Sequence, residues 1–381
     1  MIEMDIIKKI RVLQFTIAAS KGGQTQYILN LWKHIDRSRF SFDFITFAEK
    51  LNYEDELIEQ GCKVYHLVYP EKDINEFTHQ FRQICSLGYE IIEINTSYWK
   101  SMIVEEIAKE CGIPRRIIHS HGVIAGKEIG TDNYDMAMKL HYNIRESISD
   151  DIATDYWGCS VNALKWLFPK RIVENRGRVI PNTIDTERFK FDEKKRKVIR
   201  KEENLVDRFV IGFVGRIEYI KNPFFLVKIM AGVSSVIHNA LLIVIGDGSV
   251  KVKLIEEFEK QGLLNNVSFV PFTNEIERYY LAMDVFVQPS IAESFSISAL
   301  EAQCAGLQCI VSAALPDEVL VTNNIKKLPI DDVNMWIDEI EEICASTIIR
   351  GGMDRVIKSK GYSTTEWISE LEELYLGLDN K

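Results

Sequence analysis

The stretch F-V-I-G-F-V-G-R-I-E-Y-I-K-N, residues 209–222, decides the fold of this chain. Its first six residues form a short apolar run of strand length, and Gly215 follows them. Arg216 and Lys221 come directly after this run, and we expect a helix from Asn222 to Val233. A buried strand, a glycine turn and a helix make the repeating unit of parallel sheets, so the segment predicts an α/β fold.

The same unit recurs on both sides of this stretch. Further strands are expected downstream at Ala240–Ile245, Val267–Val270, Val285–Gln288 and Cys309–Ser312. Upstream strands are expected at Ile10–Thr16, Phe42–Phe47, Lys63–Leu67, Glu90–Asn95, Arg116–His121, Asp155–Ser160 and residues 179–182. Two successive sets of this kind predict two Rossmann-like domains, whose parallel sheets face a central cleft.

The domain boundary is expected in the charged stretch that separates the two sets. We assign residues 1–185 to an N-terminal Rossmann-like domain and residues 186–362 to a C-terminal Rossmann-like domain. An amphipathic helix over about 363–381 is a candidate to cross back to the first domain. The run 193–203 holds six basic residues, and we interpret it as a solvated interdomain helix.

Bulk composition excludes several classes of protein. The chain has 381 residues, is 46% hydrophobic, and has no apolar run near the ~20 residues that a membrane-spanning helix needs. Acidic Glu3 and Asp5 stand where a signal peptide would carry basic residues, so a cytoplasmic location is expected. The seven cysteines form no C-x-x-C pair, which argues against structural zinc and a disulfide framework.

The net charge of −10 disfavours a nucleic-acid partner. Residues 1–190 hold 25 Lys and Arg against 27 Asp and Glu. The whole chain holds 46 and 56 of these residues, so the part after residue 190 holds 21 Lys and Arg against 29 Asp and Glu. The first half is therefore the better candidate for peripheral contact with an anionic membrane surface.

The segment P-S-I-A-E-S-F-S-I-S-A-L-E, residues 289–301, carries the strongest chemical signal. It follows a strand and opens a helix, and the free N–H groups and dipole at a helix N-terminus suit a phosphate. Glu293 lies just before that terminus, within reach of a sugar on the phosphate. Glu301 lies about two turns further on, where its carboxylate can accept hydrogen bonds from ribose hydroxyls. The spacing alone is weak, because many helices carry solvated glutamates.

Arg216 and Lys221 strengthen that interpretation. A leaving nucleoside diphosphate gains negative charge, which two fixed cations stabilise in the transition state. Transferases that use a divalent ion usually carry Asp-x-Asp, and this triplet is absent from the sequence. We therefore expect no metal.

Two segments of the first half are further candidates. Gly22 and Gly23 connect the first strand to its helix and let the backbone approach a ligand closely. The loop lacks both G-x-G-x-x-G and G-x-x-x-x-G-K-[ST], so dinucleotide and P-loop sites are not indicated. His119 and His121 end another strand, and by alternation we expect only one to point into the cleft, with His121 the better candidate.

Six segments in this order resemble the GT4 family of glycosyltransferases, of the bacterial type that builds capsular or exopolysaccharide repeat units. They span roughly residues 11–318 and are Gly22-Gly23, residues 119–122, residues 179–185, residues 214–222, residues 245–248 and residues 289–301. The resemblance implies the GT-B fold and a retaining, metal-independent hexosyltransferase that uses a nucleoside-diphosphate sugar. It also implies that residues 1–185 form the acceptor-side domain and residues 186–362 the nucleotide-sugar-binding domain. A UDP-sugar is the expected donor, with no resident cofactor, and a glycan or polyprenyl-linked glycan at the inner membrane face is the expected acceptor.

The resemblance also implies roles for individual residues. Arg216 and Lys221 would hold the diphosphate, while Glu293 and His121 would contact the donor sugar. Glu301 would bind ribose. The remaining expected contacts with the phosphate, nucleotide or acceptor come from Gly22, Gly23, Gly215, Gly246, Phe295, Ser296 and Ile297.

The chain departs from the family pattern at three places. Thr183 follows Pro181-Asn182 where glycine is usual, and Ser294 and Ser296 replace glycines beside the first glutamate. Residues 313–315, Ala-Ala-Leu, replace a Gly-Gly pair near the donor or acceptor, which puts specificity there in question. Two alternatives stay open, namely a sugar-nucleotide epimerase of the same architecture and a noncatalytic partner subunit that keeps the fold.

Overall fold

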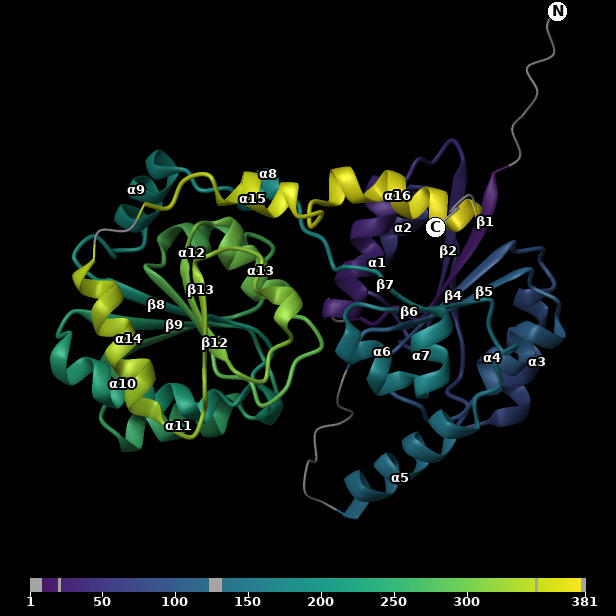
Figure 1. Ribbon diagram of the computed structural model, residues 1–381, viewed down its shortest axis with the longest axis horizontal. Helices are drawn as coiled ribbons and strands as arrows, with labels where there is room; N and C mark the ends of the chain where they lie inside the picture. Colours follow the sequence, from purple (N-terminus) through teal and green to yellow (C-terminus); the bar gives the residue numbers. More distant parts are fainter. Residues whose placement is uncertain (1–8, 20–21, 123–131, 347–348, 378–381) are drawn as a thin grey trace, which may run out of the picture. The chain divides into compact units, whose positions relative to one another are not determined.

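The computed structural model describes residues 9–19, 22–122, 132–346 and 349–377. The predicted N-terminal acidic residues, Ser20 and Lys21 of the glycine loop, and the last residues of the predicted C-terminal helix lie outside the described residues. The chain divides into two compact units, drawn in Figure 1. Unit 1 comprises Met1–Asn182 with Thr364–Lys381, and unit 2 comprises Thr183–Ser363.

Unit 1 is built on a parallel sheet of seven strands in the order β3-β2-β1-β4-β5-β6-β7. The strands are β1 (Ile10–Phe15), β2 (Phe40–Thr46), β3 (Val64–His66), β4 (Ile91–Thr96), β5 (Arg115–Ser120), β6 (Asp155–Gly158) and β7 (Gly177–Val179). The direction of winding reverses between β1 and β4, which makes this pair the topological switch point of the sheet.

Helices cover both faces of this sheet, so its central strands are buried on both sides. They are α1 (Gly23–His34), α2 (Glu54–Glu59), α3 (Ile74–Cys85), α4 (Ile103–Glu110), α5 (Asp132–Ser147), α6 (Val161–Leu167), α7 (Lys170–Arg176) and α16 (Thr364–Leu376). The C-terminal helix α16 packs against α1 (Figure 1) and places Leu371, Leu374 and Tyr375 in the core of unit 1.

Unit 2 is built on a parallel sheet of six strands in the order β10-β9-β8-β11-β12-β13. The strands are β8 (Phe209–Val214), β9 (Ala240–Ile245), β10 (Val267–Val270), β11 (Val285–Gln288), β12 (Gln308–Ser312) and β13 (Ile325–Leu328). Here the winding reverses between β8 and β11.

The helices of unit 2 alternate with these strands along the chain. They are α8 (Thr186–Phe189), α9 (Glu193–Glu202), α10 (Pro223–Val236), α11 (Lys251–Lys260), α12 (Ile276–Ala282), α13 (Ile297–Cys304), α14 (Val333–Ala345) and α15 (Met353–Ser359). Three short 3-10 turns, η1 (Tyr219–Lys221), η2 (Leu264–Asn266) and η3 (Asp317–Val319), complete the unit. Phe225 of α10 packs edge-on against the fully buried Trp336 of α14 in the core on one face of the sheet.

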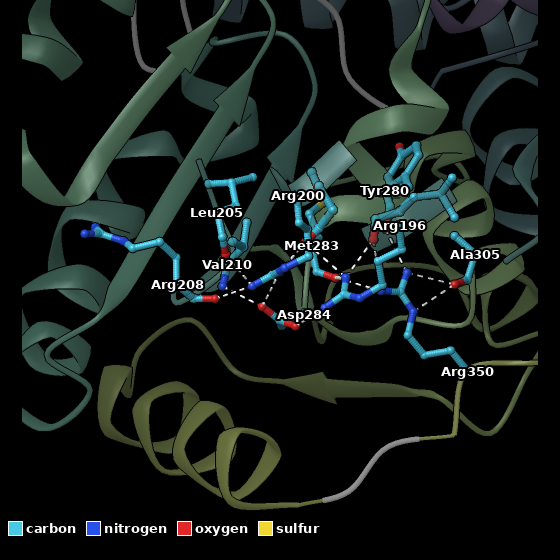
Figure 2. A network of polar contacts seen from close by, with 12 residues as sticks. Arg196, Arg200, Leu205, Arg208, Val210, Tyr280, Met283, Asp284, Ala305 and Arg350 are labelled. Carbon is cyan, nitrogen blue, oxygen red and sulfur yellow. Dashed lines mark hydrogen bonds and ion pairs between the residues drawn. The ribbon is translucent and has the colours of Figure 1, made fainter. Parts of the chain in front are cut away.

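The predicted α/β class with two parallel sheets is confirmed, and two details of the prediction were wrong. The last strand of the first set is Gly177–Val179 rather than residues 179–182, since Pro181 has no N–H to continue a ladder. Helix α9 is not simply solvated. Its Arg196 and Arg200 point into unit 2, where both bind Asp284 (Figure 2).

Within the described residues, no helix is both long enough and apolar enough to cross a membrane.

Candidate functional site

The loops that follow β8 and β11 form the candidate site of unit 2. These strands are adjacent in the sheet and mark its switch point, where ligands of open parallel sheets bind beyond the carboxyl ends. Residues 215–222 follow β8, and residues 289–296 connect β11 to α13. A backbone hydrogen bond joins the two loops, since the N–H of Ile291 donates to the carbonyl of Ile220 at 2.8 Å. The fold thus brings together the two segments that the sequence singled out.

Glu293 is held by three donors that all reach the same carboxylate oxygen. Lys221 Nζ forms an ion pair with Oε1, Gln288 Nε2 donates to it at 2.6 Å, and Ser290 Oγ donates at 2.8 Å. The side chain of Glu293 is 10% exposed. Its other oxygen, Oε2, has no hydrogen-bond partner among the described residues. One oxygen therefore fixes the carboxylate, and the other is available to accept a hydrogen bond from a ligand.

Gln288 is itself locked in orientation. Its Oε1 accepts a hydrogen bond of 2.7 Å from Ser296 Oγ, which leaves the amide Nε2 to donate to Glu293. Ser296 also caps α13, because its Oγ accepts from Ala299 N–H at 3.2 Å. Ser296 has φ 107°, a backbone conformation that favours glycine. Ser296 is therefore strained at a position where the family pattern has glycine, and its hydroxyl forms two hydrogen bonds that glycine could not form.

The N-terminus of α13 presents unpaired backbone donors. The N–H groups of Phe295, Ser296 and Ile297 have no hydrogen-bond partner among the described residues. The positive end of the helix dipole adds to their partial charges, so this turn favours an anion. Phe295 anchors the turn, since its buried ring stacks on Tyr362 with 5.7 Å between centroids.

The two predicted cations differ in their surroundings. Lys221 is 17% exposed and already paired with Glu293. Arg216 is exposed, and its side chain has no hydrogen bond or ion pair with any described residue. Arg216 is therefore the cation that can bind an added anion without breaking an existing contact.

Gly246 and Gly248 let two loops pack against each other at this edge. A Cβ added to Gly246, which has φ +139°, would lie 2.1 Å from the carbonyl oxygen of Gly215. A Cβ added to Gly248 would lie 2.2 Å from the carbonyl oxygen of Ile217. Ile217 N–H also donates to the Asp247 carbonyl at 2.8 Å. Larger side chains at these two positions would push the loop that carries Arg216 away from residues 246–248.

Glu301 lies on α13, partly buried beside α12. Its Oε2 accepts a hydrogen bond of 2.9 Å from Tyr280 Oη. Burial raises the pKa of Glu301 to about 7, and this effect outweighs the hydrogen bond from Tyr280, which lowers the pKa. A ligand hydroxyl that donates to this carboxylate would favour its ionised form.

In unit 1, Gly22 and Gly23 stand at the start of α1. Gly22 is the N-cap residue with φ −70°, a conformation open to any residue, and no other atom lies within 4 Å of an added Cβ. The described structure therefore gives no backbone reason for glycine at Gly22, although it leaves open space there.

His119 and His121 share one face of the unit 1 sheet, with 4.0 Å between ring centroids. The prediction that only one of them points into the site was wrong in its premise, because residues two apart along a strand lie on the same face. They differ in burial instead. His119 is fully buried and binds Glu93 Oε1 through Nδ1 at 2.8 Å, whereas His121 is half-buried at the strand end.

Sequence reasoning missed several residues that the structure adds to these clusters. In unit 2 they are Gln288 and Ser290, and in unit 1 Asn95, whose Oδ1 lies 2.7 Å from His121 Nε2. The available signal was a polar side chain in the last residues of a strand that is otherwise apolar. Among the described residues, no cluster of His, Cys, Asp and Glu is placed to hold a metal ion.

Comparisons with known proteins agree with this geometry. The family described as "Glycosyl transferases group 1" matches residues 194–359. Over 377 residues, the chain is 25% identical to the putative glycosyltransferase EpsF of Bacillus subtilis, covering 96% of both proteins. It is 26% identical over 212 residues to UDP-Gal:alpha-D-GlcNAc-diphosphoundecaprenol alpha-1,3-galactosyltransferase of Escherichia coli, covering 52% of this chain and 54% of that protein.

Solved structures share the whole fold at low sequence identity. Anabaena Alr3699/HepE in complex with UDP and glucose has a TM-score of 0.78 and 16% identity, covering 97% of this chain and 99% of that one. Sucrose-phosphate synthase from Thermosynechococcus elongatus has a TM-score of 0.78 and 19% identity, with the same coverage. These likenesses establish the two-sheet α/β architecture of the chain.

Proposed function

Because this chain is a GT-B glycosyltransferase with a glycosyl transferases group 1 domain at residues 194–359, we propose that it transfers a sugar from a nucleoside-diphosphate sugar with retention and without a metal. The proposed acceptor is a glycan or a lipid-linked glycan in surface-polysaccharide biosynthesis. The fixed Glu293 carboxylate beside the unpaired amides of α13 is the observation that carries this proposal.

The arrangement matches the two ends of such a donor. The Oε2 atom of Glu293 accepts from hydroxyls of the sugar, while the amides of Phe295, Ser296 and Ile297 donate to the diphosphate. Arg216 supplies a further positive charge, and Lys221 lies between the sugar-binding carboxylate and the phosphates. Glu301, on the same helix, binds the ribose.

In the proposed reaction, charge develops on the diphosphate as its bond to the anomeric carbon breaks. Arg216 and the α13 amides are already oriented before the reaction, so they stabilise that charge without having to rearrange. Such preorganised electrostatic stabilisation is usually the largest single contribution to catalysis. The acceptor hydroxyl attacks the face from which the diphosphate leaves, and a phosphate oxygen takes the hydroxyl proton. The new glycosidic bond replaces the sugar–phosphate bond, so atoms and charge balance without a protein base.

Two relatives support the choice of donor and acceptor. The name of the Escherichia coli relative specifies a UDP-sugar and a diphosphoundecaprenol-linked acceptor. Structures of the Anabaena neighbour contain UDP or UDP-glucose. We therefore propose a UDP-sugar as donor and a polyprenyl-linked glycan as acceptor, with peripheral contact to the membrane that holds such a lipid.

The test begins with binding. A panel of UDP-, GDP- and dTDP-sugars is screened by thermal shift, since a ligand that binds only the folded state raises its stability. The best donor is then incubated with polyprenyl-diphosphate glycans, with EDTA or with added Mn²⁺, and the anomeric configuration of the product is read by NMR. Transfer that is retained in EDTA and conserves the anomeric configuration supports the proposal. Turnover only with Mn²⁺, an inverted product, or conversion of the donor without an acceptor contradicts it.

A further inference from the structure

Two cysteines lie at the carboxyl ends of two neighbouring helices of unit 1. Cys85 is the last residue of α3, and Cys111 is the C-cap residue of α4. The two helices pack against each other, and the guanidinium of Arg82 on α3 forms an ion pair with the carboxylate of Glu110 on α4. Arg82 lies one turn before Cys85, and Glu110 directly precedes Cys111, so the two helix ends lie side by side.

The side chains of these two cysteines interact directly. A side-chain hydrogen bond joins the thiols of Cys85 and Cys111, and both are free thiols. Both belong to the apolar cluster on this face of the sheet, Cys85 as a buried member and Cys111 as a partly buried residue packed against it. Thiols in direct contact are the arrangement from which a disulfide can form with little movement of the backbone.

The surroundings of the two thiols differ. Cys85 is 4% exposed, and burial raises the pKa of its thiol far above that of a free cysteine. Cys111 is half-buried, and the guanidinium of Arg82 forms a side-chain hydrogen bond with its sulfur. A neighbouring arginine favours the thiolate of a cysteine, which is the reactive form. Cys111 is therefore the thiol that an oxidant from solvent reaches first, and Cys85 is the buried thiol beside it.

We propose that Cys85 and Cys111 form a reversible disulfide when the protein meets a peroxide, with Cys111 as the attacking thiol and Cys85 as the resolving thiol. The proposal goes beyond the transferase function and does not depend on it. Redox-sensing cysteines in general combine an accessible thiolate with a second cysteine that is placed to resolve it. Such a pair differs from a structural disulfide framework, because it opens and closes with the redox state of its surroundings.

The reaction balances in two steps. The Cys111 thiolate attacks one oxygen of the peroxide, the O–O bond breaks, and the other oxygen leaves as hydroxide and takes up the proton that the thiol lost. The Cys85 sulfur then attacks the sulfur of the Cys111 sulfenic acid, and the S–O bond breaks. Hydroxide leaves with the Cys85 proton as water. Each sulfur has lost one electron, and the peroxide has been reduced to two molecules of water. A dithiol reverses the change by thiol–disulfide exchange and is itself oxidised.

The disulfide would close a loop that contains the whole of β4. This strand lies between α3 and α4 in the sequence and borders β1 at the switch point of the unit 1 sheet. A cross-link of this kind stabilises mainly by restricting the unfolded chain. The thermal unfolding midpoint of the oxidised protein is therefore expected to rise by about 5–10 °C.

Disulfide formation is measured on the full chain. The reduced protein is treated with hydrogen peroxide, the remaining thiols are alkylated, and unreduced peptides are mapped by mass spectrometry. The expected product is a pair of peptides that is joined through Cys85 and Cys111 and that dithiothreitol separates. Cys344 on α14 is exposed and reports that the oxidant has acted. Alkylation of both Cys85 and Cys111 under conditions that oxidise Cys344 would overturn the proposal.

Single variants distinguish the attacking thiol from the resolving thiol. In Cys85→Ala, oxidation of Cys111 should stop at the sulfenic acid, which dimedone traps. In Cys111→Ala, Cys85 should remain a free thiol. Cys344→Ala is the matched control and should form the disulfide as the parent protein does. Dimedone on Cys85 in place of Cys111 would overturn the assignment of the two roles.

The unfolding midpoint tests whether the cross-link fits the fold. Peroxide should raise the midpoint of the parent protein and of Cys344→Ala, and it should not raise that of Cys85→Ala. A lower midpoint in the cross-linked parent would mean that the fold must distort to form the bond, and it would overturn the proposal.

The role of Arg82 is tested by the rate of disulfide formation. Arg82→Gln should form the disulfide several-fold more slowly than Arg171→Gln, in which the arginine lost is an exposed one that pairs with Asp150 in the same unit. Equal rates would contradict activation of Cys111 by Arg82.

Discussion

The two ends of strand β11 carry opposite kinds of polar cluster. Asp284 precedes the strand, at the amino edge of the unit 2 sheet, and Gln288 ends it at the carboxyl edge beside Glu293. Each end holds a carboxylate that is paired with at least one cation. At the amino edge the charges and carbonyls are paired with one another, whereas at the carboxyl edge several donors and one carboxylate oxygen lack partners among the described residues.

The amino edge holds an arginine cluster that stabilises the fold (Figure 2). Asp284 binds Arg196 at 2.5 Å and Arg200 at 3.0 Å, and it accepts from Val210 N–H at 2.8 Å. The arginines also donate to carbonyls at the end of α12, where a helix leaves its last carbonyls unpaired and favours cations.

Arg350 completes that cluster, although it forms no ion pair with an acidic residue in the part of the chain that the structure describes. Its guanidinium donates to the carbonyls of Tyr280, Met283 and Ala305 at 2.7–3.1 Å, and it is 8% exposed. Burial lowers the pKa of Arg350 to about 9. One strand therefore has paired polar groups at the end where it supports the fold, and at its other end it has donors and an acceptor that are available to a ligand.

The largest expected effect is on stability, at the amino edge. Asp284→Asn removes the charge that Arg196 and Arg200 share and should destabilise the protein by about 4 kcal/mol, as loss of one partner in a buried ion cluster does. Urea unfolding measures this loss. Asp317→Asn is the control, since its pair with Lys327 is largely exposed and should contribute at most about 1 kcal/mol. Equal effects of the two variants would remove the distinction between buried and exposed pairs.

Glu293→Gln should have the complementary result at the carboxyl edge. The amide is a weaker acceptor for the donor sugar than a carboxylate, so kcat/KM is expected to fall by about 10²–10³-fold. The unfolding free energy is expected to fall by less than in Asp284→Asn, because one cation loses its partner rather than two. Steady-state kinetics and urea unfolding together give the answer. Glu259→Gln, on the exposed side of α11, serves as the matched control. Full activity in folded Glu293→Gln would show that this edge is not the donor site.

Glu301 links stability to pH at the same edge. Its pKa of about 7 in the folded protein lies above the ordinary value of 4.5, so the folded state binds the proton more tightly. Proton binding by Glu301 stabilises the folded protein fully below pH 4.5, and this contribution is lost as the pH rises through 7. It amounts to about 3 kcal/mol in all, at about 1.4 kcal/mol for each pH unit between the two pKa values.

Glu301→Gln should therefore stabilise the protein at pH 8 and have little effect at pH 4.5, while it weakens nucleotide binding. Urea unfolding at both values, with the exposed Glu256→Gln as control, checks the pH dependence. The same gain at both pH values would mean that burial of an ionised carboxylate is not the cause.

The sheets were largely predictable from the sequence because their central strands are buried on both faces. Runs such as Ala240–Ile245 are continuously apolar for that reason. The edge strand Ile325–Leu328 was missed, since it contains two lysines and is half-buried. Helix α3 was also missed, although Asp73 caps it and Phe77, Phe81 and Ile84 recur at helical spacing. In that case the signal was present.

The candidate site was predictable as loops but not as contacts. Arg216, Lys221 and Glu293 stood out because they follow strands in recognisable segments. The pairing of Lys221 with Glu293 joins residues 72 apart in the sequence and depends on β8 and β11 being neighbours, which no local pattern states. The burial of Arg196 was unpredictable for the same reason, because only packing against α12 takes it out of solvent.

The smallest expected effect separates strain from capping at Ser296. Its positive φ costs of order 1–3 kcal/mol, while its hydroxyl caps α13 and orients Gln288. Ser296→Ala keeps the strain and loses both bonds, so a destabilisation of about 1–2 kcal/mol is expected. Ser296→Gly loses the same bonds but relieves the strain, and its unfolding free energy should stay within about 0.5 kcal/mol of the parent value.

Both Ser296 variants release Gln288, so both should lose activity several-fold through the freed Glu293 carboxylate, although only one loses stability. Urea unfolding and kcat/KM, measured on the same preparations, resolve the two contributions. If Ser296→Gly kept full activity, orientation of Gln288 by the hydroxyl would be unnecessary. If it were as unstable as Ser296→Ala, the positive φ would cost the fold nothing, and the serine would be there for its bonds alone.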